Sequence, residues 1–183
     1  MLLVRLPTPE RSQLSPQGQE CYDEIVGSRG EVRINFKALL NSPDVAARLA
    51  HLGTYLRFEG PLPEVLKEVA ILAVARETEG HYVWTAHEIL ARKAGVDEES
   101  INSLRRGEVP QGGGAQSAVA RYVWALLRDH RVDDNLFEEV WGHLGDQGMV
   151  DVTLLMGYYT TMSLSTTALG IETGPKGFST LGL

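Results

Sequence analysis

Two side chains of this sequence are well suited to move a proton together, His87 and Glu68. The segment from Gly80 to Gly95 reads as a helix, and His87 falls within its apolar stripe at helical spacing. We expect that stripe to be buried and to consist of Val83, Ala86, Leu90, Ala91 and Ala94. A buried imidazole needs a hydrogen-bond partner, because burying an unpaired polar group is costly. Glu68 is the candidate partner, since it lies in the almost continuously apolar segment 62–76.

The pair of Glu68 and His87 permits two interpretations. A carboxylate that holds the Nδ1–H of a histidine orients the ring and makes it more basic, which suits general acid/base catalysis. Alternatively, Glu68 neutralises a buried His87 and fixes the packing of two helices. Spacing alone favours the structural interpretation, and it does not establish that the two side chains touch.

The segment from Leu62 to about Arg105 resembles the core of the carboxymuconolactone decarboxylase and alkylhydroperoxidase D superfamily. The peroxidase branch has a Glu, eleven residues, a Cys, two residues, a second Cys, three residues, and a His. On this chain the Glu falls on Glu68 and the His on His87, whereas the two cysteine positions fall on Gly80 and Val83. The frame of a proton relay therefore matches, and the redox pair is absent.

The pattern Tyr-x-Trp-x-x-His at residues 82–87 resembles a cysteine-free branch of this superfamily. The resemblance implies an all-α, alkylhydroperoxidase D-like helical bundle with two helical halves that assembles into homo-oligomers. It also implies a lyase-like, cofactor-free acid/base enzyme that acts on a small organic acid or lactone. In that enzyme His87 would carry the proton and Glu68 would orient it.

Three aromatic residues are candidates for substrate binding: Tyr82, Trp84 and Tyr158. Tyr82 begins the helix of His87, and its hydroxyl suits a substrate carboxylate. Tyr158 lies in the last long helical segment, where it or Tyr159 is placed to pack over His87. The alternative for each is core or subunit-interface packing, where amphipathic aromatic residues are common. We favour packing for Trp84.

Two other functions stay open. A dithiol peroxidase needs an attacking and a resolving thiol, and Cys21 is the only cysteine of the chain. A non-enzymatic oligomer that binds a small molecule would use the same pocket without turnover. No metal or other cofactor is expected, because the five histidines have no ligand spacing.

Bulk properties limit the partners of the chain. Its 183 residues suit a single domain, and the net charge of −7 disfavours nucleic acid. No run of 18 apolar residues predicts a membrane span, and the N-terminus lacks the pattern of a signal peptide. A lone cysteine fits a reducing, cytoplasmic setting. We expect a small-molecule substrate and further copies of the chain as partners.

Helix start and stop signals divide the predicted domain, residues 1–183, into five parts. Ser15-Pro16 and Ser42-Pro43 are N-caps followed by proline, Asp97 is a third N-cap, and Gly95 ends a helix. The parts are N-terminal helices 1–60, core motif helices 61–106, a linker 107–116, C-terminal helices 117–172 and an irregular tail 173–183. The predicted helices are 15–26, 36–40, 42–58, 62–76, 80–95, 97–106, 117–130, 133–144 and 150–169.

Overall fold

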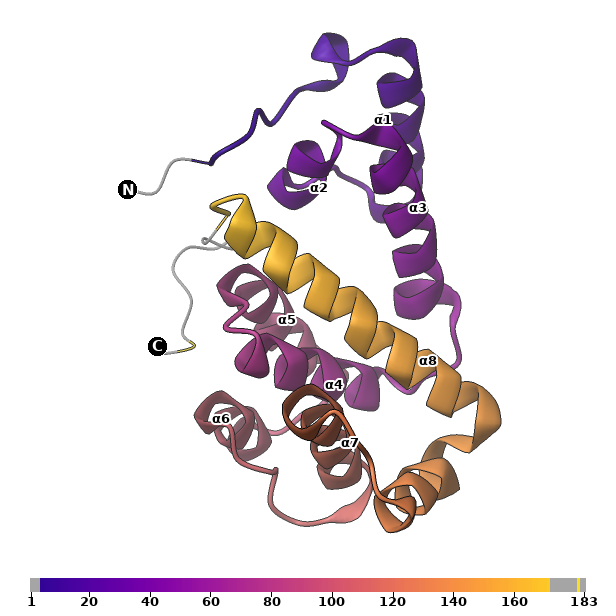
Figure 1. The fold of residues 1–183 in the computed structure, drawn as a ribbon, viewed down its shortest axis with the longest axis vertical. Coiled ribbons are helices and arrows are strands. Elements are labelled where there is room, and N and C mark those ends of the chain that lie inside the picture. The colour runs from indigo at the N-terminus through magenta and orange to yellow at the C-terminus, as the bar shows by residue number, and fades with distance from the viewer. Residues whose placement is uncertain (1–3, 172–180, 182–183) are drawn as a thin grey trace. The chain divides into compact units, whose positions relative to one another are not determined.

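The described part of the chain is helical. The computed structural model describes residues 4–171 and 181, and within them it contains helices and no strand (Figure 1). The all-α prediction is therefore confirmed for this part of the molecule. The predicted tail 173–183 lies outside the described residues, apart from Leu181.

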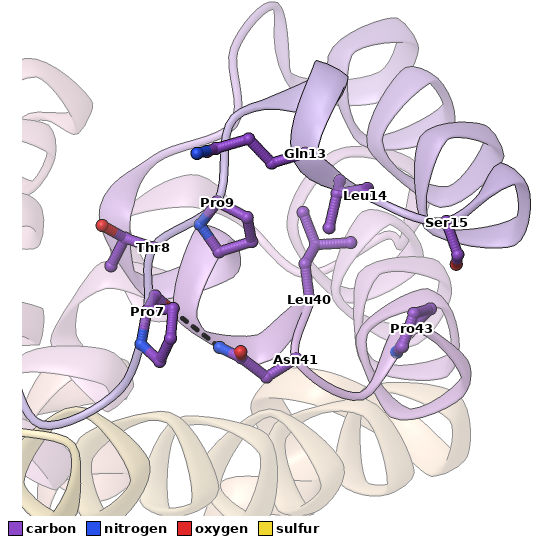
Figure 2. A pocket seen from close by; sticks show the side chains of 9 residues that line it. All are labelled: Pro7, Thr8, Pro9, Gln13, Leu14, Ser15, Leu40, Asn41 and Pro43. Carbon is purple, nitrogen blue, oxygen red and sulfur yellow. Dashed lines mark hydrogen bonds between the residues drawn. The ribbon is translucent and has the colours of Figure 1, made fainter.

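The first compact unit comprises the residues up to Gly60, together with the segment Ala168–Ile171. Its elements are η1 (Arg11–Gln13), α1 (Pro16–Arg29), α2 (Ile34–Leu39), α3 (Pro43–Thr54) and the π-helical turn η2 (Tyr55–Glu59). As predicted, the Ser15 side chain caps α1, accepting a hydrogen bond from the backbone N–H of Gly18 at 3.2 Å. A cavity of about 500 Å³ lies in this unit, where Asn41 donates to the Pro7 carbonyl at 2.7 Å (Figure 2).

The second unit comprises Pro61–Thr167. Its elements are α4 (Glu64–Glu77), α5 (His81–Ala94), α6 (Glu98–Arg106), α7 (Gly114–Trp124), the π-helical turn η3 (Ala125–Asp129) and α8 (Asp134–Ala168), whose last residue belongs to the first unit. Every residue of α4 from Leu66 to Ala75 is buried, because α5, α6 and α7 all pack against α4. This burial explains why α4 has apolar residues on almost all of its faces.

Several predicted helices differ from the structure. The helix predicted at 15–26 extends to Arg29, and the one predicted at 42–58 becomes π-helical at Tyr55. The helix predicted at 117–130 begins at Gly114, inside the predicted linker, and becomes the π-helical turn at Ala125. The two helices predicted at 133–144 and 150–169 meet at Gly145, whose φ of 64° interrupts α8. Glycine is the residue that adopts a positive φ without steric cost, so the helix resumes directly after it.

The predicted buried stripe of α5 is wrong in part. Ala86, Leu90 and Ala94 are only partly buried. The buried residues of α5 are instead Tyr82, Val83, Trp84, Thr85, His87, Glu88 and Ala91. The buried surface differs from the predicted stripe because two helices, α4 and α6, both pack against α5.

None of the helices in the described residues is both long enough and apolar enough to cross a membrane.

We predict that Asp97→Ala lowers the free energy of unfolding by about 1 kcal/mol at neutral pH, because it removes an N-cap. Asp97 caps α6 by accepting from the Ser100 backbone N–H at 2.9 Å and from its hydroxyl at 2.7 Å. These hydrogen bonds lower the pKa of Asp97 below its usual value. Its contribution is therefore present above the pKa of the unfolded chain and is lost as the pH falls through the folded pKa.

Urea unfolding at pH 7 and at pH 3 measures this contribution. The loss for Asp97→Ala should shrink at pH 3. The control is Asp134→Ala, which changes an acidic residue in the first turn of α8, where the side-chain cap comes from Asp133. Equal losses for the two variants at pH 7 would contradict the capping role.

Candidate active site

Glu68 and His87 form a hydrogen-bonded pair between α4 and α5. The His87 Nδ1 and the Glu68 Oε2 are 2.8 Å apart. Their side chains are 6% and 4% exposed, so each supplies the polar partner that burial demands of the other. With an ionised carboxylate as acceptor, Nδ1 carries the hydrogen and donates it. Nε2 is then the nitrogen through which the ring can exchange a proton with another molecule.

Two tyrosines of α8 extend this pair. The ring of Tyr159 meets the ring of His87 edge-on, with centroids 4.8 Å apart and an interplanar angle of 81°. Tyr158 meets Tyr159 in the same manner at 5.2 Å. The predicted residue Tyr158 therefore contacts Tyr159, and Tyr159 contacts the histidine. In the structure, Tyr159 lies on one face of α8 with Leu155, Met162 and Thr166, all of which are buried.

The other two predicted aromatic residues are buried in the first turn of α5. Tyr82 is 5% exposed and Trp84 is fully buried. The guanidinium of Arg105 lies over the Trp84 ring, 5.6 Å from its centroid, so Trp84 takes part in the contact between α5 and α6.

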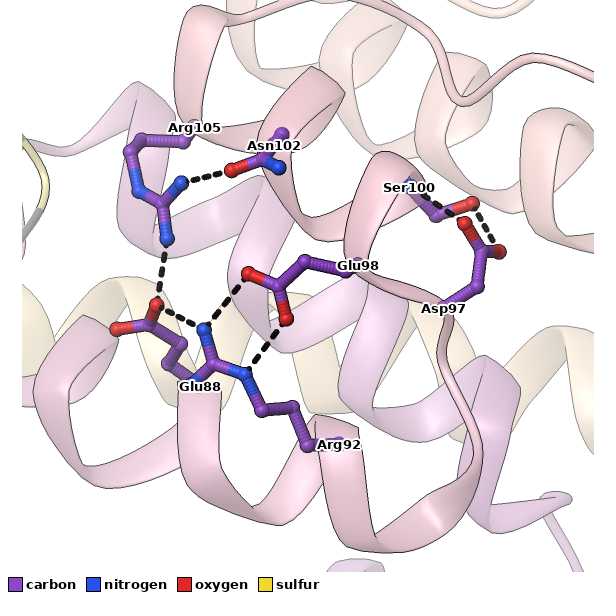
Figure 3. A network of polar contacts seen from close by, with 7 residues as sticks. All are labelled: Glu88, Arg92, Asp97, Glu98, Ser100, Asn102 and Arg105. Atoms are coloured by element: carbon purple, nitrogen blue, oxygen red, sulfur yellow. Dashed lines mark hydrogen bonds and ion pairs between the residues drawn. The ribbon is translucent and has the colours of Figure 1, made fainter.

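A polar network fixes the outer side of α5 to α6 (Figure 3). Glu88 is buried, and its Oε1 accepts hydrogen bonds from Arg92 at 2.8 Å and from Arg105 at 2.5 Å. Arg92 also binds both carboxylate oxygens of Glu98, at 2.8 and 2.9 Å. The hydrogen bond from Arg92 lowers the pKa of Glu98. Charged hydrogen bonds of this kind are stronger than neutral ones, and they hold the residue that follows His87 in the chain.

The first cysteine position of the peroxidase pattern has no room for a side chain. A Cβ at Gly80 would lie 2.4 Å from the Oγ and 2.8 Å from the Cβ of Ser163 on α8. Gly80 has a φ of −78°, which any residue adopts, so the restriction comes from packing and not from the backbone. The second position, Val83, is buried.

Candidate binding sites for other groups lie elsewhere or are absent from the described residues. Within these residues, no group of three His, Cys, Asp or Glu side chains is arranged to hold a metal ion. Besides the cavity of the first unit, a cavity of about 400 Å³ lies where α7 and η3 meet the start of α8. Neither cavity is lined by Glu68 or His87.

Comparison with known proteins gives a fold, and a family match over part of the chain. Residues 43–126 match the model of the carboxymuconolactone decarboxylase family. No curated protein sequence matches the chain.

Three solved structures share the fold. The first is an uncharacterized peroxidase-related protein with an alkylhydroperoxidase AhpD core from Ralstonia eutropha JMP134, with a TM-score of 0.74, 18% identity, and coverage of 91% of this chain and 90% of that one. The second is an uncharacterized peroxidase-related protein from Silicibacter sp. TM1040, with a TM-score of 0.71, 16% identity, and coverage of 90% and 87%. The third is the debrominase Bmp8 in its apo form, with a TM-score of 0.69, 14% identity, and coverage of 88% and 87%. At these identities the similarity establishes the fold and leaves the chemistry open.

We predict that Gly80→Ala lowers the free energy of unfolding by about 1–3 kcal/mol, because its methyl group overlaps Ser163. The Ser163→Gly change should cost less in the Gly80→Ala background than in the wild type, since it removes the overlapping atoms. Denaturant unfolding of the two single variants and the double variant measures this coupling.

The control is Gly142→Ala, at a helical glycine of α8 whose added Cβ has nothing within 4 Å. That change should leave the stability unaltered or raise it, because alanine is the better helix former. A Gly80→Ala variant as stable as the wild type would show that α8 does not approach α5 so closely.

Proposed function

We propose that this chain is a member of the carboxymuconolactone decarboxylase and alkylhydroperoxidase D-like superfamily, and that it is a cofactor-free acid/base enzyme acting on a small organic acid or lactone. The family match over residues 43–126 and the shared fold support the membership. The observation that supports this proposal is the 2.8 Å hydrogen bond between the buried Glu68 carboxylate and the His87 Nδ1. A carboxylate in this position orients an imidazole and stabilises the imidazolium that forms when the ring takes up a proton.

The reaction that suits this pair is decarboxylation with proton return. The bond between the substrate carbon and its carboxylate breaks, CO₂ leaves, and the electron pair stays on the carbon. The protonated His87 then donates its Nε2 proton to that carbon, while its Nδ1–H remains bonded to Glu68. The ring regains a proton from solvent in the next cycle.

Access to His87 requires movement, because its side chain is only 6% exposed. The ring of Tyr159 packs against the imidazole of His87. In this proposal, Tyr159 shifts when substrate enters, and its ring then bounds the reacting centre. Exclusion of water by the closed site strengthens the electrostatic interaction between Glu68 and the imidazolium.

The burial of His87 also favours a second candidate, a non-enzymatic protein that binds a small molecule in the same place. That protein would bind its ligand saturably without forming product, and binding would survive His87→Ala. The enzyme would lose product formation in the same variant while its fold stays intact.

We predict that His87→Gln lowers product formation by about 10²–10⁴-fold, the usual contribution of a general acid or base. The assay measures CO₂ release from carboxymuconolactone, followed by a panel of small carboxylated lactones. Glu68→Gln should also lower turnover, because a neutral amide stabilises the imidazolium less well. Thermal unfolding of each variant excludes loss of the fold as the cause of a lower turnover.

Cys21→Ser is the matched control, and its turnover should equal that of the wild type. Saturable binding without CO₂ release by the wild type, unchanged in His87→Ala, would overturn the enzyme proposal in favour of the binding protein.

We predict that Cys21 reacts slowly with thiol reagents in the native protein. Cys21 is 4% exposed, and burial raises the pKa of its thiol, so little thiolate is present near neutral pH. An aromatic disulfide reagent at pH 8 should label native Cys21 at least about 10-fold more slowly than the same residue in urea. Rapid native labelling, with hydroperoxide turnover that Cys21→Ser abolishes, would instead support a peroxidase that uses one cysteine.

A further inference from the structure

Two arginine side chains of the second unit meet beside Gly107, the residue that ends α6. A Cβ built on Gly107 would lie 3.5 Å from the Nε and 3.9 Å from the Nη2 of Arg76, and 3.7 Å from the Nη2 of Arg128. Apart from the neighbouring residues of the chain, these guanidinium nitrogens are the nearest atoms to that position. The glycine therefore leaves the two cations accessible on this side, where a side chain would crowd them.

Arg76 has no counter-ion in contact with it. Among the described residues, no hydrogen bond or ion pair joins its side chain to a partner. Its Nε is shielded from solvent and has no hydrogen-bond acceptor. A partly buried cation without a counter-ion is costly, so the side chain is suited to bind an anion from outside the chain.

The charges around Gly107 do not cancel. Arg128 donates from its Nε to the Glu77 Oε2 at 2.7 Å, and its guanidinium lies over the Trp124 ring, 4.6 Å from the centroid. Glu77 therefore balances one of the two guanidinium groups, and one positive charge remains at Arg76. Like charges at this distance repel one another, and an anion between them would relieve the repulsion. Because α4 and α6 both end here, their C-terminal dipoles stabilise the two cations in its absence.

A cavity adjoins the two arginines. Arg128 and Trp124 line the cavity of about 400 Å³ where α7 and η3 meet the start of α8. Val109, two residues after Gly107, lines it as well. A volume of this size lies within the range of small-molecule sites. The body of a small ligand therefore has space beside a guanidinium group that can bind its charged end.

The carboxylates in the wall of this cavity are mostly engaged elsewhere. Glu139 forms an ion pair with Arg121 at 2.5 Å. Asp133 caps α8, with its Oδ1 accepting from the Leu136 backbone N–H at 3.0 Å. Asp129 is exposed to solvent, where water and salt screen its charge. None of the three contacts the Arg76 side chain.

We propose that Arg76 and Arg128 bind the carboxylate group of a small organic acid, whose remaining atoms lie in the adjoining cavity. Guanidinium groups bind carboxylates through charged hydrogen bonds of matched geometry, and a single carboxylate balances the one remaining positive charge. Arg76 follows Glu68 by eight residues on α4, which is about 12 Å along the helix. The site is therefore separate from His87, and the proposal does not depend on the proposed reaction.

Titration with benzoate, followed by nuclear magnetic resonance of the arginine Nε–H groups, tests the site. The Arg76 Nε–H is shielded from solvent, so its signal should be observable and should shift saturably with benzoate. Arg76→Lys assigns the signal by removing it. Benzamide has a similar shape and no charge, and it should leave the signal in place. An Arg76 signal that benzoate does not move, or that benzamide moves equally, would overturn the proposal.

Variants of the arginines locate the bound carboxylate. Arg76→Gln and Arg128→Gln should each raise the dissociation constant of benzoate at least about 10-fold, since each removes a charged hydrogen bond. The backbone amide signals of Gly107 and Val109 report binding in these variants. The matched control is Arg121→Gln, which changes an arginine of the same cavity that already pairs with Glu139. An equal loss of affinity in Arg121→Gln would overturn the assignment to Arg76 and Arg128.

A pair of glycine variants tests the position beside the arginines. The methyl group of Gly107→Ala would lie within 4 Å of both guanidinium groups, so it should raise the dissociation constant of benzoate. The control is Gly95→Ala, at the residue that ends α5, where φ is also positive and an added Cβ meets no atom within 4 Å. That change carries similar backbone strain and should leave benzoate binding unaltered. Equal affinities in the two variants, with helical circular dichroism retained, would contradict the placement of the carboxylate at Gly107.

Discussion

The hydrogen bond between Glu68 and His87 is the constraint on which the second unit depends. Both side chains are almost fully buried, and the His87 Nδ1 is hydrogen-bonded to the Glu68 Oε2. Removing either partner would deprive a buried polar or charged group of this hydrogen bond, at a cost well above that of losing an exposed ion pair. The register between α4 and α5 therefore has to bring Oε2 to Nδ1. A shift of one helix by a single residue would turn one of the two groups away by about 100°.

That register is fixed from several directions. On the inner side, α4 is buried along ten consecutive residues, so it cannot slide without opening cavities against three neighbouring helices. On the outer side, Glu88 ties α5 to α6 through Arg92 and Arg105. From α8, Tyr159 closes against the imidazole. The histidine thus lies on a helix that is packed or hydrogen-bonded to its neighbours on several sides, as a precisely positioned side chain requires.

Sequence patterns predicted some of these features and missed others for identifiable reasons. Prediction located α4 and α5 to within two residues and the caps at Ser15, Asp97 and Gly95, because those signals are local. The choice between Tyr158 and Tyr159 depends on which face of α8 meets α5, and adjacent residues lie about 100° apart on a helix. Likewise, the buried surface of α5 depends on α6 packing against it, which periodicity within α5 alone does not reveal.

The absence of the cysteine pair is built into the packing and is more than a change of two residues. Ser163 occupies the space that a side chain at position 80 would need, and its own hydroxyl has no hydrogen-bond partner among the described residues. Leaving a buried hydroxyl unpaired has a cost, which the close approach of α8 to the start of α5 offsets. A dithiol at these positions would push α8 outward and carry Tyr159 away from His87, since Ser163 and Tyr159 are one turn apart on the same helix. A side chain at position 80 and the present position of Ser163 on α8 are therefore in steric conflict. In the fold that this chain shares with the peroxidase-related structures, the hydrogen bond between Glu68 and His87 is present, whereas Ser163 occupies the space of a side chain at position 80.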